Sequence, residues 1–267
     1  MPKTTSSIRI GIGGWTFAPW RGVFYPDDLT QKRELEYASR KLTSIEVNGT
    51  FYGAQKPETF AKWRDEAPDG FVFSLKGPRF ATNRRVLAEA GESIERFLAS
   101  VAPLGETLGA INWQLPPTKK FDPEDMAAFI ALLPDALDGR PLRHALEVRH
   151  DSFRTPEFID MARAAGIAIV MAGDSRYPQI ADPTAPFVYA RIMGTAEGEA
   201  AGYSKQALDA WAERARTYAA GGTPADLESV APPEARPPAA RDVYLYVISG
   251  HKVANPAAAM ALIERLA

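Results

Sequence analysis

The sequence has 267 residues, a formal net charge of -2 and no cysteine. The near-neutral balance argues against a surface built for bulk binding of nucleic acid or membrane, and the lack of cysteine excludes disulfides and thiolate metal sites. No run of about 18 apolar residues predicts a transmembrane helix. The first residues also lack the apolar stretch of a signal peptide, so we expect a cytoplasmic protein without a membrane partner.

Short apolar strands alternate with amphipathic helical segments along the chain. The strands are expected at residues 8–13, 44–48, 71–76, 109–115, 144–149, 167–173, 187–192 and 243–248. Helical patterns are expected at residues 29–42, 57–66, 91–105, 122–134, 155–166, 204–219 and 255–267. Alternation of this kind predicts a parallel sheet covered by helices.

Eight strand units in a chain of about 250 residues predict an α/β fold, a single TIM-like (β/α)8 barrel over residues 1–267. An open, doubly wound sheet is the alternative, but the "GIGGWT" that follows the first strand lacks the G-x-G-x-x-G spacing of a dinucleotide site. Residues 219–242 are rich in Pro, Ala and Gly. We expect them to form a mobile surface excursion on the amino-terminal face of the barrel, where helix-to-strand loops lie.

Six consecutive strands carry polar side chains near their carboxyl ends, most of them with the parity that points into a barrel. They are Glu46, Asn48, Ser74, Lys76, Asn112, Gln114, Glu147, Arg149, Asp174, Tyr189 and Arg191. A structural ion network, with Glu46 paired to Arg149 or Glu147 paired to Lys76, would explain some of them. A ligand site explains the whole set better, because this end of a (β/α)8 barrel carries the active site.

The charges of this set restrict the ligand. Lys76, Arg149 and Arg191 predict a small anionic or sugar-like molecule, since arginine forms bidentate pairs with carboxylate and phosphate groups. Glu46 and Glu147 are the candidate catalytic residues of a hydrolase or isomerase that uses carboxylates as acid and base. The remaining candidate contacts to the substrate are Trp15, Asn48, Tyr52, Gln114 and Asp174.

Two other functions remain open. A divalent-metal enzyme of nuclease or isomerase type could use Glu46, Glu147 and Asp174, but the sequence has no paired-histidine spacing, so we assign no metal ligands and leave the cofactor open. A non-catalytic ligand-binding or scaffold protein would also carry polar groups at this position. Acid–base catalysis predicts a mouth carboxylate with a strongly shifted pKa, whereas a fully paired network predicts that both glutamates stay ionised.

Three stretches resemble the DUF72 (YecE-like) family of TIM-barrel proteins. They are "IGIGGWTFAPWRGVFYP", "SIEVNGTFYGAQKPETFAKWRDEAPDGFVFSLKGP" and "ALEVRHDSF", in that order, and the similarity runs from Ile10 to about Arg191. The resemblance implies a TIM-like barrel and no specific activity. It also implies that the recurring motif positions of the family include Trp15, Glu46, Asn48, Thr50, Phe51, Tyr52, Lys76, Glu147 and Arg149.

Overall fold

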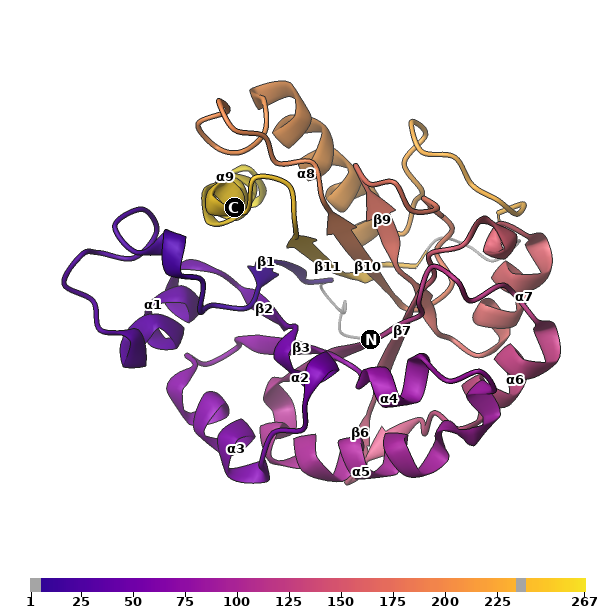
Figure 1. Ribbon diagram of the computed structural model, residues 1–267. Helices are drawn as coiled ribbons and strands as arrows, with labels where there is room; N and C mark the ends of the chain where they lie inside the picture. The colour runs from indigo at the N-terminus through magenta and orange to yellow at the C-terminus, as the bar shows by residue number, and fades with distance from the viewer. Residues whose placement is uncertain (1–5, 234–238) are drawn as a thin grey trace, which may run out of the picture.

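The computed structural model describes residues 6–233 and 239–267, and its centre is a sheet of nine parallel strands surrounded by helices (Figure 1). The strands are β1 (Ile8–Gly13), β2 (Ser44–Val47), β3 (Val72–Lys76), β4 (Leu108–Gln114), β7 (Arg143–Glu147), β8 (Ala168–Ile169), β9 (Met171–Gly173), β10 (Phe187–Ile192) and β11 (Asp242–Val247). Their order is β8-β7-β4-β3-β2-β1-β11-β10-β9.

The sheet closes through the sixth predicted strand, which is divided in two. β8 pairs with β7 and β9 pairs with β10, and only Val170 separates β8 from β9 along the chain. The amide of Val170 donates to the carbonyl of Leu146 at 2.9 Å. The two edges of the sheet are therefore one segment of chain, and the predicted eight-strand barrel is confirmed with one strand interrupted.

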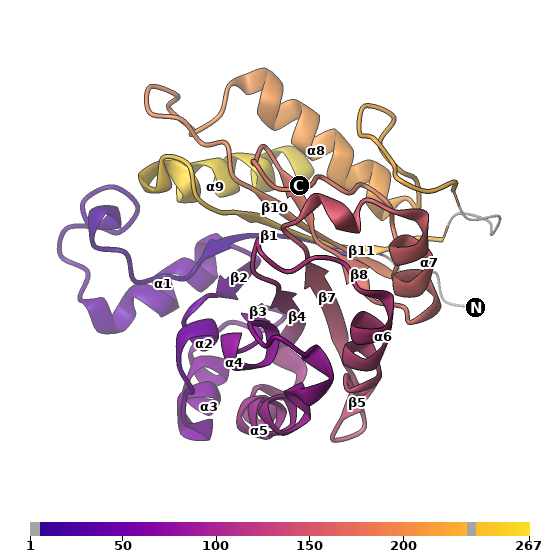
Figure 2. The ribbon, with the colours of Figure 1, turned by 45° about the vertical axis from the view of Figure 1, so that its right-hand side comes forward.

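Helices cover the outside of the barrel (Figure 2). They are α1 (Glu34–Lys41), α2 (Gly49–Tyr52), α3 (Pro57–Glu66), α4 (Arg79–Thr82), α5 (Gly91–Val101), α6 (Pro123–Ala131), α7 (Pro156–Ala164), α8 (Lys205–Ala219) and α9 (Asn255–Leu266). Side chains of Asp122, Thr155 and Ser204 accept backbone N–H groups at the starts of α6, α7 and α8, as expected of N-cap residues. Within the described ranges, no helix combines the length and apolarity needed to cross a membrane.

A short antiparallel hairpin, β5 (Ala136–Leu137) and β6 (Arg140–Pro141), was not predicted. It turns at Asp138 and Gly139, whose φ angles of 50° and 75° are positive. Positive φ at both central residues is typical of the two-residue hairpin turn that Asp-Gly favours.

The interior of the barrel is filled by large side chains on one side and small ones on the other. Tyr189, Tyr244 and Tyr246 project inward from β10 and β11. The hydroxyl of Tyr246 lies 2.6 Å from the hydroxyl of Ser44 and donates to that of Ser74 at 2.7 Å. Hydrogen bonds between uncharged hydroxyl groups therefore lie in the middle of the barrel, and the charged side chains lie at its carboxyl end.

The segment between α8 and β11 corresponds to the predicted excursion at 219–242, of which residues 234–238 lie outside the described residues. Its described part is fixed to the body of the protein. The carboxylate of Asp182 accepts the amides of Val230 at 2.7 Å and Ala231 at 3.0 Å, and Glu228 pairs with Arg154 at 2.9 Å.

Candidate functional site

Arg191, near the end of β10, joins the two candidate catalytic glutamates. Its Nε and Nη2 donate to Glu46 at 3.0 and 3.1 Å, and its Nη1 donates to both oxygens of Glu147 at 2.8 Å. The side chain of Arg191 is 4% exposed and both glutamates are fully buried. Burial alone would lower the pKa of Arg191, but the charges of Glu147 and Glu46 raise it above its usual range, so the guanidinium stays charged.

Glu147, at the end of β7, also accepts hydrogen bonds from Arg149, two residues further along the chain, and from Asn112 on β4. Arg149 donates to Oε1 through Nε at 2.9 Å and Nη2 at 2.6 Å, and the Asn112 amide donates to Oε2 at 2.9 Å. Burial raises the pKa of Glu147, but the nearby charges of Arg191, Arg149 and Lys76 outweigh burial and lower it to about 2. Glu147 is therefore a carboxylate at neutral pH.

Glu46, on β2, accepts hydrogen bonds from a tyrosine as well as from Arg191. The hydroxyl of Tyr189 donates to its Oε2 at 2.7 Å. Burial, together with the neighbouring Glu46, raises the pKa of Tyr189 well above its usual value, so the phenol remains a neutral donor. Every carboxylate oxygen of Glu46 and Glu147 consequently accepts at least one hydrogen bond from the protein.

Lys76, at the end of β3, is a buried ammonium without a carboxylate partner. Its Nζ donates to Gln114 Oε1 and lies 4.5 Å from the centre of the Phe51 ring. The residue is 5% exposed, and within the described part of the chain no carboxylate oxygen lies within 4.0 Å of the ammonium. Burial, followed by the charge of Arg191, lowers the pKa of Lys76 to about 8, although Glu147 and Glu46 partly oppose this.

Arg149 lies at the outer edge of this cluster. Its Nη2 donates to the same Gln114 oxygen as Lys76, at 2.6 Å, and its guanidinium lies 4.3 Å from the centre of the Tyr177 ring. Its side chain is 16% exposed. Three cationic side chains (Lys76, Arg149 and Arg191) therefore face two carboxylates (Glu46 and Glu147), which leaves a net charge of +1 when Lys76 is protonated. We call these five residues, with Asn112, Gln114 and Tyr189, the mouth cluster.

The structure brings together six of the predicted site residues: Glu46, Lys76, Gln114, Glu147, Arg149 and Arg191. Their ion pairs differ from those that the sequence suggested. Glu46 pairs with Arg191 instead of Arg149, and Glu147 pairs with Arg149 and Arg191 instead of Lys76.

Three other predicted contacts, Trp15, Tyr52 and Asp174, lie apart from the mouth cluster. The ring of Trp15 packs edge-on against the ring of Trp63, with 5.0 Å between the ring centroids, and both belong to the packing between the barrel and its helices. Tyr52 is 65% exposed on α2. Asp174 is exposed and accepts the indole N–H of Trp211 at 2.9 Å. Asn48 is partly buried and lies at the same end of the barrel as the mouth cluster, because its amide nitrogen is 2.7 Å from the position of a Cβ on Gly13, which pairs with Glu46.

Three residues of the site were not among the assigned contacts. The strand pattern included Asn112 and Tyr189 among the inward polar side chains, but they were assigned no role in the site. Tyr177 lies in the irregular segment after β9, where no periodicity indicates the direction of a side chain.

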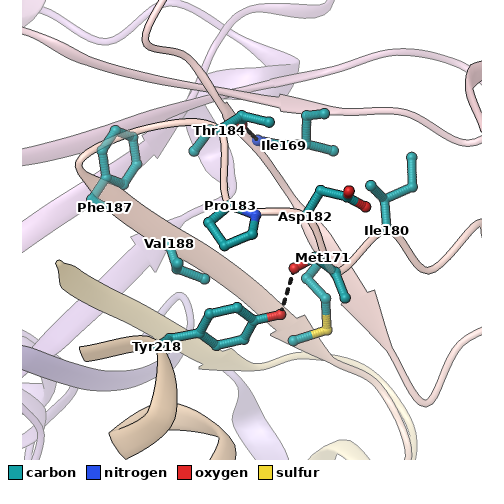
Figure 3. A pocket seen from close by; sticks show the side chains of 11 residues that line it. Ile169, Met171, Ile180, Asp182, Pro183, Thr184, Phe187, Val188 and Tyr218 are labelled. Atoms are coloured by element: carbon teal, nitrogen blue, oxygen red, sulfur yellow. Dashed lines mark hydrogen bonds between the residues drawn. The ribbon is translucent and has the colours of Figure 1, made fainter. Parts of the chain in front are cut away.

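A small pocket, shown in Figure 3, is lined by residues 180–184, by side chains of β8, β9 and β10, and by Tyr218 of α8. Its volume is about 10 Å³, which leaves room for one water molecule at most. The hydroxyl of Tyr218 donates to the carbonyl of Ala181 at 2.8 Å beside it (Figure 3). We interpret this space as a packing void. Across residues 6–233 and 239–267, no three His, Cys, Asp or Glu side chains gather closely enough to hold a metal ion.

Comparisons with known proteins agree with the motifs and the fold. UPF0759 protein YecE of Escherichia coli is 31% identical over 146 residues, which are 55% of this chain and 50% of that protein. UPF0759 protein YunF of Bacillus subtilis is 24% identical over 159 residues, 57% of this chain and 54% of that protein. The chain thus spans about half the length of the curated relatives it matches.

Solved structures show the same fold over nearly the whole chain. A DUF72 family protein from Thermotoga maritima has a TM-score of 0.74 at 21% identity, covering 97% of this chain and 99% of that chain. A DUF72 family protein from Enterococcus faecalis has a TM-score of 0.71 at 18% identity, covering 97% of this chain and 95% of that chain. The family model described as "Protein of unknown function DUF72" matches residues 9–267. The chain therefore belongs to the DUF72 family.

Proposed function

We propose that the barrel mouth binds a small anionic molecule, such as a sugar phosphate or a small carboxylic acid, and that Lys76 and Arg149 contact it. The observation that supports this most is the excess of cations in the mouth cluster. A buried ammonium without a carboxylate partner is costly. A bound anion could accept from Lys76 Nζ and from Nη1 of Arg149, the group of that guanidinium that does not donate to Glu147 or Gln114.

In this proposal Glu46 and Glu147 position the guanidinium groups. Each of their oxygens already accepts hydrogen bonds, and Glu147 stays ionised because Arg191 and Arg149 lower its pKa to about 2 despite burial. Acid–base catalysis by this pair, the mechanism predicted from the sequence, would require one carboxylate to exchange its protein donors for the substrate.

A hydroxyl group on the ligand would pair with a buried oxygen atom of Asn112. The Oδ1 atom of Asn112 is buried and has no hydrogen-bond partner among the described residues, while its amide nitrogen is held by Glu147. Buried acceptors are seldom left unpaired. A ligand hydroxyl, or a water that bridges to it, would satisfy this oxygen, which favours sugar phosphates and hydroxy acids among small anions.

The test is a thermal unfolding experiment with inorganic phosphate over a range of concentrations. We expect phosphate to raise the Tm of the wild-type protein by mass action, and to do so much less in Arg149→Gln. Arg143→Gln is the matched control, because Arg143 is an arginine of the same barrel, 41% exposed at the opposite end. General salt effects act on all three proteins alike. An equal shift in Arg149→Gln and the wild type would contradict the proposal.

A further inference from the structure

We infer that Lys76 is an amine nucleophile that forms an imine with a small anion carrying an aldehyde or ketone group. The inference rests on the proposed anion site and names the substrate class more narrowly. The geometry that carries it is the sharing of one oxygen atom: Gln114 Oε1 accepts from both Lys76 Nζ and Arg149 Nη2.

This shared acceptor places the amine and the guanidinium within reach of a single small molecule. Arg149 offers its Nη1 group, whose contact is to the hydroxyl of Tyr177 at 3.3 Å and which can also donate to a carboxylate or phosphate. Lys76 offers a nitrogen atom at the end of a barrel strand. A molecule that fills both positions has its anionic group and its carbonyl carbon only a few bonds apart. Compact 2-oxo acids and keto or aldehyde sugar phosphates meet this requirement.

The surroundings of Lys76 also favour the neutral amine, which is the reactive form. The ring of Phe51 excludes water on one side, and the charged groups around the amine are Arg191, Arg149, Glu147 and Glu46. Burial and the two arginines lower the pKa of Lys76 to about 8, against the two glutamates. At pH 7 roughly a tenth of the molecules then carry a neutral amine, compared with fewer than about one in a thousand for a lysine of ordinary pKa.

The reaction balances without an oxidant or a metal. The lone pair of the amine attacks the carbonyl carbon, a C–N bond forms, and the oxygen takes up a proton as the nitrogen loses one. Loss of water from this carbinolamine leaves the imine. The imine is cationic when protonated, and the two carboxylates of the mouth cluster, Glu46 and Glu147, lie close enough to influence the charge of Lys76.

Lys252 provides an internal comparison. Burial also lowers the pKa of this lysine, and its ammonium lies 4.2 Å from the centre of the Phe17 ring. It differs from Lys76 because it belongs to the short turn before α9 and is outside the mouth cluster. If a lowered pKa were sufficient, Lys252 would react as well, whereas the inference requires Arg149 beside the amine.

The experiment incubates the protein at pH 7 with pyruvate and sodium cyanoborohydride, which reduces an imine to a stable amine, and locates the modified lysine by peptide mass spectrometry. We expect one modification, at Lys76, that is slowed by inorganic phosphate. Lactate, which has the same charge but no carbonyl, should give none. Lys76→Arg, which keeps a cation at this position, should lose the modification, and Lys76→Met should lose it as well if the arginine variant does not fold.

Each other outcome overturns a defined part of the account. Modification at Lys252 or across exposed lysines, with Lys76 unmodified, contradicts the inference. No modification in a protein whose Tm still responds to phosphate contradicts the imine and leaves the anion site standing. Modification of Lys76 that phosphate does not slow would mean that the amine reacts outside an anion site, which contradicts the proposed function.

Discussion

The two ends of the barrel each hold an arginine–carboxylate cluster, and the two clusters differ in burial. At the amino-terminal end, Arg143 pairs with Asp242 at 2.6 Å, with side chains 41% and 22% exposed. At the carboxyl end, Arg191 pairs with Glu46 and Glu147 at 4% and 0% exposure. Burial raises the pKa of Asp242, but hydrogen bonds from Ser7 and the charges of Arg143 and Arg9 lower it, so the first cluster also holds more cations than carboxylates. Burial is what separates the two clusters.

This difference indicates what each cluster does. A partly solvated pair loses little hydration and contributes little to stability. A buried network loses much more hydration and is rarely favourable for stability alone. The unmatched charge on Lys76 adds to that penalty, so the mouth cluster is better explained by a ligand that completes it. The predictions below test this contrast, beginning with the largest effect.

Removing Arg191, the central cation of the mouth cluster, should show the difference between the two ends of the barrel most clearly. Arg191→Met leaves two buried carboxylates without their bridging partner, so we expect a loss of about 3 to 5 kcal/mol in the free energy of unfolding. Arg143→Met at the other end should cost about 1 kcal/mol or less. Urea unfolding of both variants measures this difference, and equal losses would break the contrast between the ends.

Acid should lower the free energy of unfolding through Glu147, at the carboxyl end of the barrel. Its pKa is lowered from an ordinary 4.5 to about 2 in the folded protein, so its contribution to stability is complete above about pH 4.5 and is lost as the pH falls toward 2. Glu147→Gln should lose less stability than the wild type over that range. Glu106→Gln, at a side chain 90% exposed, should follow the wild-type curve in urea unfolding. Parallel curves for Glu147→Gln and the wild type would contradict the account.

Raising the pH above 8 should increase the stability of the folded protein through Lys76. Its pKa falls from 10.5 to about 8 on folding, so the unfolded chain binds more protons than the folded protein between these values. The wild type should therefore gain stability relative to Lys76→Met as the pH rises from about 8 to 10.5. The comparison is made by urea unfolding at several pH values. A constant difference between the two proteins would show that Lys76 is not an unpaired buried ammonium.

The smallest effect is expected at Tyr52, which the sequence assigned to the site. Its side chain is 65% exposed, and Tyr52→Ala should change the free energy of unfolding by less than about 0.5 kcal/mol. It should also leave the phosphate-dependent rise in Tm unchanged. A lost phosphate response would place Tyr52 back in the site.

Strand parity made much of the site predictable. Residues two apart on a strand point to the same face, so Glu46, Lys76, Gln114, Glu147 and Arg149 could all be placed inside one end of the barrel from the sequence. The helices are similarly marked by their periodicity and N-cap residues. The β5–β6 hairpin was missed, although its Asp138-Gly139 turn is a recognisable signal.

The partners within the site could not be predicted in the same way. Arg191 reaches Glu46, 145 positions away in the sequence, because the stagger between strands decides which side chains meet inside a closed barrel, and periodicity does not record that stagger. Loop residues are still harder to place. Asp174 has a φ of 52°, and its carboxylate accepts the indole N–H of Trp211 outside the mouth cluster, which no strand pattern indicates.

The most direct test of the central claim is an NMR titration of the Lys76 ammonium in the presence and absence of inorganic phosphate. We predict a pKa of about 8 without phosphate and a higher one with it, because a bound anion favours the charged amine. The titration of Lys252 should not respond to phosphate. An identical pKa for Lys76 under both conditions would contradict the claim that the barrel mouth is an anion site.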